Sequence, residues 1–205
     1  MISQPVPPTL EPGPAWEVAR LFPDQGDWDD TDYLVLNQMT NRFVELTDGW
    51  LEVLEMPTKS HQKMAQHLFK LLDQYSKAGD VGEVVLAPYP VRMRSGKYRE
   101  PDIVFALSEH SERLGEDFAD GADLVMEVIS QDRERDLVRK RRDYAEAGIP
   151  EYWIVDPRDR RVFVLRLQQG AYHVHGEFGD KVRATSVLLA GFEVDVGELF
   201  AEGGI

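Results

Sequence analysis

The chain has 205 residues, of which 42% are hydrophobic and 29% charged; these values exclude an intrinsically disordered protein and predict one folded domain. Its formal net charge of −14 at pH 7 repels polyanions, which excludes a protein that coats nucleic acid without specificity. Because cysteine is absent, disulfides, thiolate nucleophiles and Cys-ligated zinc are excluded as well.

The N-terminal segment has neither the basic nor the apolar region of a secretory signal, and no apolar run approaches the roughly 18–20 residues of a membrane span. We therefore expect a cytoplasmic protein without a membrane partner. Five of the twelve prolines fall within residues 1–14, which predicts a disordered, proline-rich tail. A single domain is expected over residues 15–205.

The first part of this domain carries helix and hairpin signals. Residues 15–40 contain short apolar segments, which predict one or two helices with Asp29 or Thr31 as an N-cap. Residues 42–56 alternate apolar and polar side chains around a Thr-Asp-Gly turn and predict a β-hairpin. A helix is predicted over residues 59–77, where apolar side chains recur at spacings of three and four.

Extended segments follow. Residues 83–93 and 101–107 are predicted strands separated by a polar turn at residues 94–100, and Pro88 and Pro90 indicate that the first strand is bent or lies at an edge. Residues 123–129 form a nearly continuous apolar run, which is typical of a strand near the centre of a sheet.

The C-terminal part begins with a predicted helix over residues 133–147, which Gly148 and Pro150 end. A hairpin is predicted from residues 151–157 and 161–168, and short strands and loops are expected after it. Strands with intervening helices predict an α/β or α+β fold.

Two acidic residues stand out in these strands. Asp102 opens one strand after Pro101, and Glu127 lies inside the apolar strand between Met126 and Val128. A buried carboxylate is costly unless it is paired or binds a cation. If the two strands are neighbours, both carboxylates and the Val128 carbonyl would offer the hard oxygen ligands that Mg²⁺ prefers.

The helix that follows adds a possible third element. Asp136, Lys140 and Tyr144 are four residues apart and therefore lie along one helix face. If this face looks back at the strand, the Lys140 ammonium would approach the carboxylates, where it could orient a water and stabilise charge on a phosphate. Residues 133–144 also carry six basic side chains, a local exception to the acidic composition.

These motifs carry a family resemblance. REPDIVF contains Asp102, LVMEVIS contains Glu127, and the helix is followed by AGIPEYWIVDP. The first two resemble the PD-(D/E)xK restriction-endonuclease-like superfamily. The ordered set, preceded by VELTDGWLEVLEMPTKSHQKMAQHL, is similar to the Uma-two family of endonucleases over roughly residues 40–200.

The resemblance implies a restriction-endonuclease-like core, in which helices flank a central mixed β-sheet, together with an N-terminal hairpin and helix. It also implies a metal-dependent phosphodiesterase in which Asp102 and Glu127 bind Mg²⁺ or Mn²⁺ and Lys140 assists the attacking water. The superfamily pattern would place lysine at position 129, where this chain has Ile129, and Lys140 is the position that matches instead.

Two further residues match recurring family positions. The resemblance gives Glu45 the role of a peripheral ligand or of a group that polarises a second water. It gives His61 a contact with a phosphate.

Each of these residues has a structural alternative. Asp102 could begin a strand or turn, and Glu127 could pair with an arginine. Lys140 could be a solvated residue paired with Asp136, and Tyr144 could be packed in the core. His61 could cap a helix or lie at the surface.

Other motifs do not support a different chemistry. His173 and His175 share a strand face without a third ligand, which favours exposed strand residues. Ser130 lacks a nucleophile elbow and is more typical of a helix cap, and no glycine-rich phosphate loop occurs. Four basic side chains could extend a basic rim, although an ordinary charged hairpin would show the same pattern; they are Arg92, Arg94, Lys97 and Arg99.

Two hypotheses follow. The first is an endonuclease that hydrolyses nucleic acid, most simply DNA, as a homodimer or higher homo-oligomer. The second is a catalytically silent domain of the same fold that binds a partner or acts as a scaffold, which the net charge and the displaced lysine favour. They differ in whether the Asp102 and Glu127 carboxylates converge.

Overall fold

The structure, a computed structural model, describes residues 22–129 and 133–205. The predicted tail at residues 1–14 and Ser130 lie outside the described residues.

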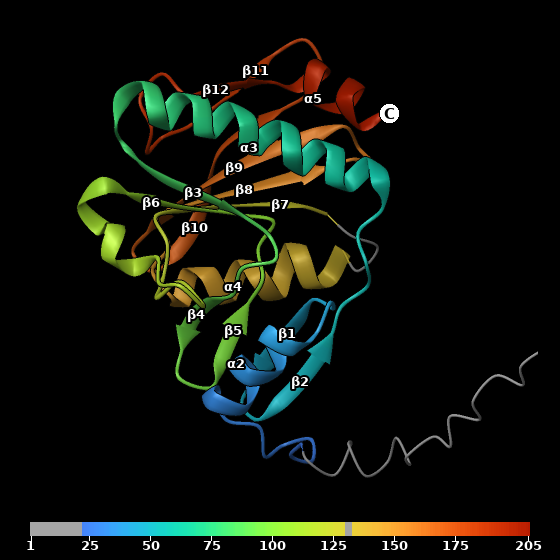
Figure 1. Ribbon diagram of the computed structural model, residues 1–205. Helices are drawn as coiled ribbons and strands as arrows, with labels where there is room; N and C mark the ends of the chain where they lie inside the picture. The colour runs from blue at the N-terminus through green and yellow to red at the C-terminus, as the bar shows by residue number, and fades with distance from the viewer. Residues whose placement is uncertain (1–21, 130–132) are drawn as a thin grey trace, which may run out of the picture.

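A six-stranded mixed sheet forms the centre of the molecule (Figure 1), with the strand order β10-β9-β8-β7-β6-β3. Neighbouring strands run antiparallel except for β7 and β8, which are parallel and are connected through a helix. The strands are β3 (Gly82–Leu86), β6 (Ile103–Leu107), β7 (Leu124–Val128), β8 (Glu151–Asp156), β9 (Arg161–Gln168) and β10 (Ala171–Phe178).

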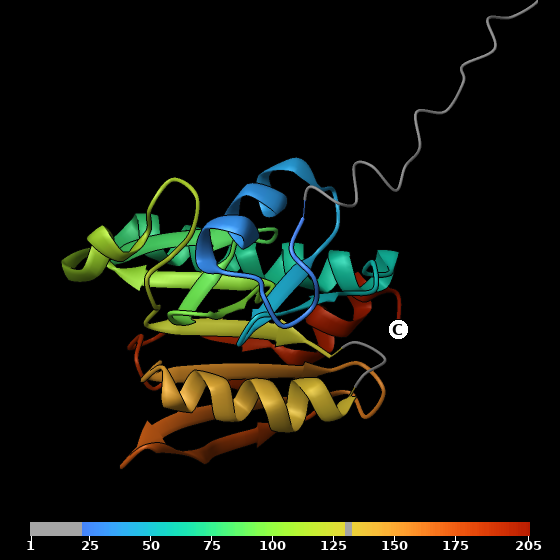
Figure 2. The same cartoon turned by 90° about the horizontal axis from the view of Figure 1, so that it is seen from below.

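Helices cover both faces of this sheet (Figure 2). On one face lie α3 (Lys59–Gly79) and α5 (Val196–Gly203), and on the other lies α4 (Lys140–Glu146), which continues directly from the π-helical turn η2 (Arg135–Arg139).

Because side chains alternate along a strand, the sheet supplies two apolar cores. One contains Met64, Leu68 and Leu72 of α3 packed on alternate residues of the central strands, among them Leu124 and Met126. The other packs Tyr144 of α4 against the intervening residues, Val125, Tyr152 and Ile154.

A second, antiparallel sheet has the order β2-β1-β5-β4 and lies below α4 in Figure 1. Its strands are β1 (Val44–Thr47), β2 (Trp50–Val53), β4 (Val91–Arg94) and β5 (Lys97–Arg99). The helix α2 (Asp30–Met39) packs on it through Tyr33, which contacts a small core of Val44, Leu46 and Tyr98. The remaining elements are the 3₁₀ turn η1 (Ser108–Arg113) and the strand pair β11 (Arg183–Thr185) and β12 (Glu193–Asp195).

The main sequence predictions are confirmed. The hairpin is β1–β2, the helix over residues 59–77 is α3, and the apolar run at residues 123–129 is the central strand β7. Asp29 is the N-cap of α2, where its side chain accepts a hydrogen bond from the Asp32 amide.

Three predictions of local structure were wrong. The polar turn at residues 94–100 contains the strand β5, and the single strand expected over residues 83–93 is divided between the two sheets as β3 and β4. Pro88 and Pro90 lack the amide needed to continue a ladder, so the chain leaves the large sheet there. The edge position that these prolines indicated is confirmed, because β3 and β4 are both edge strands. The short strands and loops expected at the C-terminus include the helix α5, whose N-cap is Asp195.

Candidate functional site

The strand register places Asp102 and Glu127 on the same face of the large sheet. Ile103 of β6 is paired with Met126 of β7, and the strands are antiparallel, so Asp102 stands opposite Glu127 one step further along the ladder. The side chains of both residues therefore point away from the α3 core, toward the side of the sheet covered by α4. From the sequence, these carboxylates were expected to meet only if the two strands were neighbours, and the pairing of β6 with β7 shows that they are.

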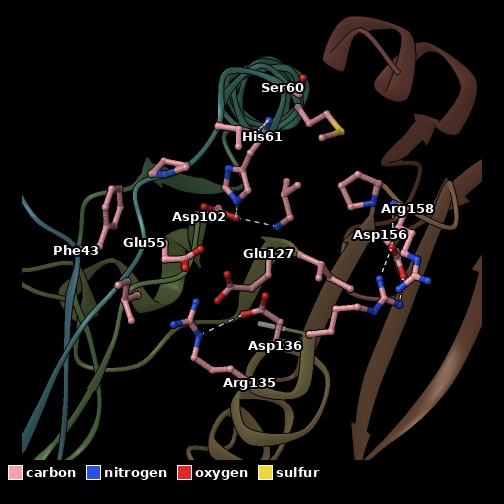
Figure 3. Close-up of a pocket in the computed structure, with 18 of the residues that line it drawn as sticks. Phe43, Glu55, Ser60, His61, Asp102, Glu127, Arg135, Asp136, Asp156 and Arg158 are labelled. Carbon is pink, nitrogen blue, oxygen red and sulfur yellow. Dashed lines mark hydrogen bonds and ion pairs between the residues drawn. The ribbon is translucent and has the colours of Figure 1, made fainter. Parts of the chain in front are cut away.

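Both carboxylates open into a pocket of about 450 Å³ (Figure 3). The pocket lies where the first turn of α3, the ends of β6 and β7, and the turn η2 come together, so that His61, Asp102, Glu127, Asp136 and Lys140 all line it. Four of the five predicted catalytic residues thus share one cavity.

Asp102 is oriented by two donors. Its Oδ2 atom accepts a hydrogen bond from the Val128 amide at 2.7 Å and lies 3.2 Å from the Nε2 atom of His61. Burial lowers the pKa of His61, but the Asp102 carboxylate outweighs this effect and raises the pKa above its ordinary value. The His61 amide donates to the Thr58 hydroxyl at 3.2 Å, which fixes the first turn of α3 at the pocket.

Glu127 is almost fully buried and is held by two donors from α4. Its Oε1 atom accepts hydrogen bonds from the Lys140 ammonium at 2.6 Å and from the Tyr144 hydroxyl at 2.5 Å. Burial raises the pKa of the Glu127 carboxyl, and the Lys140 charge opposes this shift. Among the described residues, Asp102 and Glu127 each use one oxygen for these bonds, which leaves the other oxygen for a ligand.

Lys140 lies at the centre of an acidic cluster. Its Nζ atom is 2.6 Å from Glu127, 3.6 Å from Glu45 and 3.8 Å from Asp136. Burial lowers the pKa of Lys140, but these three carboxylates together raise it, so the ammonium stays charged. The alternative of a solvated lysine is wrong, because the side chain is only 3% exposed. Tyr144 is packed in the core as expected, and its hydroxyl contacts the site as well.

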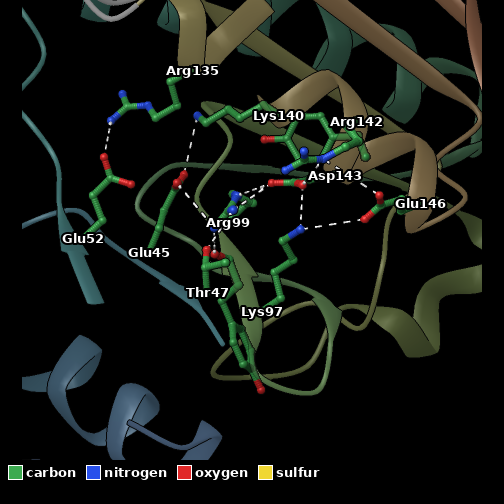
Figure 4. Close-up of polar contacts among 12 residues, drawn as sticks. Glu45, Thr47, Glu52, Lys97, Arg99, Arg135, Lys140, Arg142, Asp143 and Glu146 are labelled. Atoms are coloured by element: carbon green, nitrogen blue, oxygen red, sulfur yellow. Dashed lines mark hydrogen bonds and ion pairs between the residues drawn. The ribbon is translucent and has the colours of Figure 1, made fainter. Parts of the chain in front are cut away.

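A buried charge network that the sequence did not reveal lies behind this cluster (Figure 4). Arg99 of β5 lies 3.7 Å from Glu45 and donates to Asp143 of α4 at 2.9 and 2.7 Å. Lys97 donates to the other Asp143 oxygen at 2.6 Å. The network therefore connects α4 to the second sheet. Glu45 stands behind Lys140 and is not among the described residues that line the pocket.

The hypothesis of an extended basic rim was wrong. Each of its four cations has a carboxylate partner, and the pairs are Arg92–Asp120, Arg94–Asp48, Lys97–Asp143 and Arg99–Asp143. The pocket instead carries cations at its edge from other segments. Arg133 pairs with the buried Asp156 at 2.8 and 2.6 Å, and the exposed Arg158 stands nearby.

Glu100 is a pocket residue that sequence reasoning missed. Its Oε1 atom accepts a hydrogen bond from Asn37 at 2.6 Å, while its buried Oε2 atom has no hydrogen-bond partner within the described part of the chain. Burial raises the pKa of Glu100 to about 7. Its place directly before the Pro-Asp pair was the available signal. His173 and His175 are exposed on β10, as expected from the sequence.

The donor set at the pocket fits a hard divalent cation. Asp102 and Glu127 offer carboxylate oxygens, and Val128 lines the same pocket. Within residues 22–129 and 133–205, no cluster of three or more His, Asp or Glu side chains is arranged to enclose a metal. Mg²⁺ commonly uses one or two carboxylates and completes its shell with water and substrate phosphate, so two carboxylates suffice.

The fold and the site define a class. A solved structure described as a putative nuclease belonging to DUF820, from Anabaena variabilis ATCC 29413, resembles this chain with a TM-score of 0.66 and 18% sequence identity, over 80% of this chain and 93% of that chain. The fold is thus restriction-endonuclease-like, with a central mixed sheet between helices.

The sequence profile of the Uma2 family, described as "Putative restriction endonuclease", matches residues 30–197. The chain belongs to this family, and family and fold together support a nuclease with a nucleic-acid substrate. No curated protein matches the chain. Among the described helices, none is both long and apolar enough for a membrane span.

Proposed function

We propose that the protein is a metal-dependent endonuclease that hydrolyses phosphodiester bonds of DNA at the Asp102–Glu127 pair. The observation that carries the proposal is the convergence of these two carboxylates, from adjacent antiparallel strands, on one pocket. A scaffold gains nothing from placing a carboxylate in the apolar centre of a sheet, where burial is costly.

Asp102, Glu127 and the main-chain carbonyl of Val128 would hold Mg²⁺ or Mn²⁺. When bound, such an ion lowers the pKa of a coordinated water and neutralises charge on the phosphate. His61 keeps the Asp102 carboxylate oriented through its Nε2 contact at 3.2 Å, and its position at the pocket also allows contact with a phosphate.

Lys140 has two roles in the proposal. Its ammonium favours the ionised form of Glu127, since the 2.6 Å contact opposes the rise in pKa that burial causes. It also supplies positive charge beside the position of the attacking water and of the charged phosphate. Glu45 and Arg99 act behind it, because Glu45 lies 3.6 Å from the ammonium and Arg99 compensates the Glu45 charge.

The test is cleavage of supercoiled plasmid and of single-stranded circular DNA with Mg²⁺ or Mn²⁺. We expect cutting by the wild type that requires the metal and falls at least about a hundredfold in Asp102→Asn and Glu127→Gln. Glu109→Gln, which changes an exposed carboxylate of η1 outside the residues that line the pocket, is the matched control and should cut normally. Cutting that persists in Asp102→Asn, or in excess chelator, would contradict the proposal.

One observation favours the silent domain. Lys140 and Tyr144 already satisfy one oxygen of Glu127 without a metal. If the wild type cuts neither substrate with either metal while its folding is intact, this second function takes precedence.

A further inference from the structure

The pocket has an apolar wall that phosphodiester hydrolysis alone does not require. Apolar side chains make up a large part of its lining, among them Phe43, Leu54, Met56, Pro57, Met64 and Ile129. The Leu54 amide donates to the Phe43 carbonyl at 2.8 Å, so the base of the β1–β2 hairpin holds Phe43 at the pocket. The volume of about 450 Å³ lies within the range of pockets that enclose a small organic molecule.

The arrangement across the pocket is polarised. In Figure 3, Phe43 stands on one side, Arg158 and Asp156 stand on the other, and Asp102 and Glu127 lie between them. A nucleotide is polarised in the same way, because it has a flat base with apolar faces at one end and a charged phosphate at the other. Bases within an intact duplex are stacked and paired, so their faces are accessible only in single strands or after extrusion.

We infer that this pocket binds one unstacked nucleobase next to the scissile phosphate, and that the preferred substrate is therefore single-stranded DNA or DNA with an unpaired nucleotide. The inference rests on the proposed function for the position of the scissile phosphate. The base packs against Phe43 and Met56, while Arg158 contacts the phosphate backbone on the opposite side.

A second, smaller pocket extends this site. It has a volume of about 150 Å³ and shares Phe43, Pro57, His61 and Asp102 with the first. Gln62 and Gln66, one turn apart on α3, line it with exposed amides that can both donate and accept hydrogen bonds. A single strand thus has adjacent positions on both sides of the His61–Asp102 contact.

The test separates binding from cutting by using Asp102→Asn protein and a fluorescein-labelled oligodeoxynucleotide of fixed sequence. Fluorescence anisotropy compares the single strand, its perfect duplex, and the duplex with one bulged nucleotide. We expect the single strand to bind at least about tenfold more tightly than the perfect duplex, and the bulged duplex to fall between them.

Variants of the apolar wall test the position of the base. In the same protein, Phe43→Ala should weaken single-strand binding about tenfold and leave duplex binding unchanged, because only an unstacked base reaches the wall. Met56→Ala should act in the same direction, and its side chain is 51% exposed, so folding is preserved. Phe178→Ala removes a partly buried ring outside both pockets and serves as the control.

The outcomes separate this inference from the proposed function. Duplex binding that equals or exceeds single-strand binding overturns the inference, as does an equal loss for both forms in Phe43→Ala. Neither result affects plasmid cleavage, which tests the nuclease independently. If no DNA is cut but the single-strand preference and the Phe43→Ala loss are observed, the nucleobase site stands and the nuclease proposal fails.

Discussion

Glu127 shows how one residue satisfies both the fold and the site. A carboxylate buried in a sheet costs several kcal/mol unless charge and hydrogen bonds compensate it. Lys140 and Tyr144 provide this compensation on Oε1, while Oε2 stays available toward the pocket. The side chain can therefore remain in place with or without a cation, so the site does not depend on a metal for its shape.

The Tyr144 hydroxyl should contribute measurably to this compensation. We expect Tyr144→Phe to lower the free energy of unfolding by about 1.5–3 kcal/mol, because it removes a buried hydrogen bond to a charged acceptor. Urea unfolding measures the change. Tyr172→Phe is the matched control, since that hydroxyl donates to the neutral Ile149 carbonyl at 2.7 Å and should cost only about 0.5–1.5 kcal/mol. Equal losses in the two variants would contradict this account.

Asp143 gives a prediction with a defined pH dependence. Burial raises the pKa of Asp143, but Lys97 and Arg99 outweigh it and hold the pKa below the ordinary value of 3.8. Asp143→Asn leaves two buried cations without a shared partner and should cost about 3–5 kcal/mol at pH 7.

The sign of the pH effect follows from the lowered pKa. The stability that ionised Asp143 contributes is fully present above its unfolded pKa and is lost as the pH falls through the folded one. In urea unfolding from pH 7 to pH 3, the gap between wild type and Asp143→Asn should therefore narrow below about pH 4. Asp120→Asn, at a pair with Arg92 in which the aspartate side chain is 61% exposed, should cost less than about 1 kcal/mol. A gap that is constant over the whole range would refute the assignment.

The sequence could identify some site residues and not others, for a physical reason. Glu127 is conspicuous because a charge interrupts an apolar run, and Lys140 because it shares a helix face with Asp136 and Tyr144. Arg99 and Asp143 carry no such local signal. Their pairing joins segments 44 residues apart, and each looks like an ordinary surface charge until the fold buries it.

At the scale of elements, the first turn of α3 links stability to the site. The Thr58 hydroxyl caps this helix by accepting from the His61 amide. Thr58→Ala should lower the free energy of unfolding by about 1 kcal/mol and reduce cleavage more than a remote change of equal cost, because His61 loses its fixed position. Thermal unfolding and plasmid cleavage measure the two effects. Thr58→Ser keeps the cap, and if it is as impaired as Thr58→Ala, the capping explanation fails.

Predictability also differed among elements. The helix α3 and the strand β7 have long, regular apolar patterns, and both were predicted correctly. The strand β5 has three residues, of which Lys97 and Arg99 are charged and share Asp143 as a buried partner, so no apolar pattern marks it. For α5, the apolar residues Val196, Leu199 and Phe200 follow the N-cap Asp195 at helical spacing, which was a usable signal. The helix was missed because the segment is short and contains glycine.

On the scale of the whole molecule, a net charge of −14 has to be reconciled with a polyanionic substrate. More than half of the lysine and arginine side chains in the described chain pair with carboxylates, so these cations are less able to replace counterions on DNA. A weak salt dependence of binding follows, since its slope scales with the number of phosphates neutralised.

Arg158 should account for one part of that slope. We expect Arg158→Gln to reduce the slope of log K against log salt by about 0.7 for single-stranded DNA, the contribution of one phosphate contact. Anisotropy titrations at several salt concentrations provide the measurement. Arg183→Gln, which changes an exposed arginine paired with Glu193, should leave the slope unchanged. An unaltered slope in Arg158→Gln would remove this residue from the binding surface.

The π-helical turn before α4 contains an extra residue, which can be looked for in related sequences and removed by mutation. In η2 the Lys140 amide donates to the Arg135 carbonyl, five residues back, so this turn holds one residue more than an α-helical turn. Relatives with a regular helix would show a one-residue gap just ahead of the lysine. Deleting Val138, whose side chain is 60% exposed, should restore α-helical geometry and shift Asp136 relative to Lys140, because the two residues would then be three positions apart instead of four. Circular dichroism should then show an intact helix while DNA cleavage falls, and retained cleavage would mean that the extra residue has no catalytic purpose.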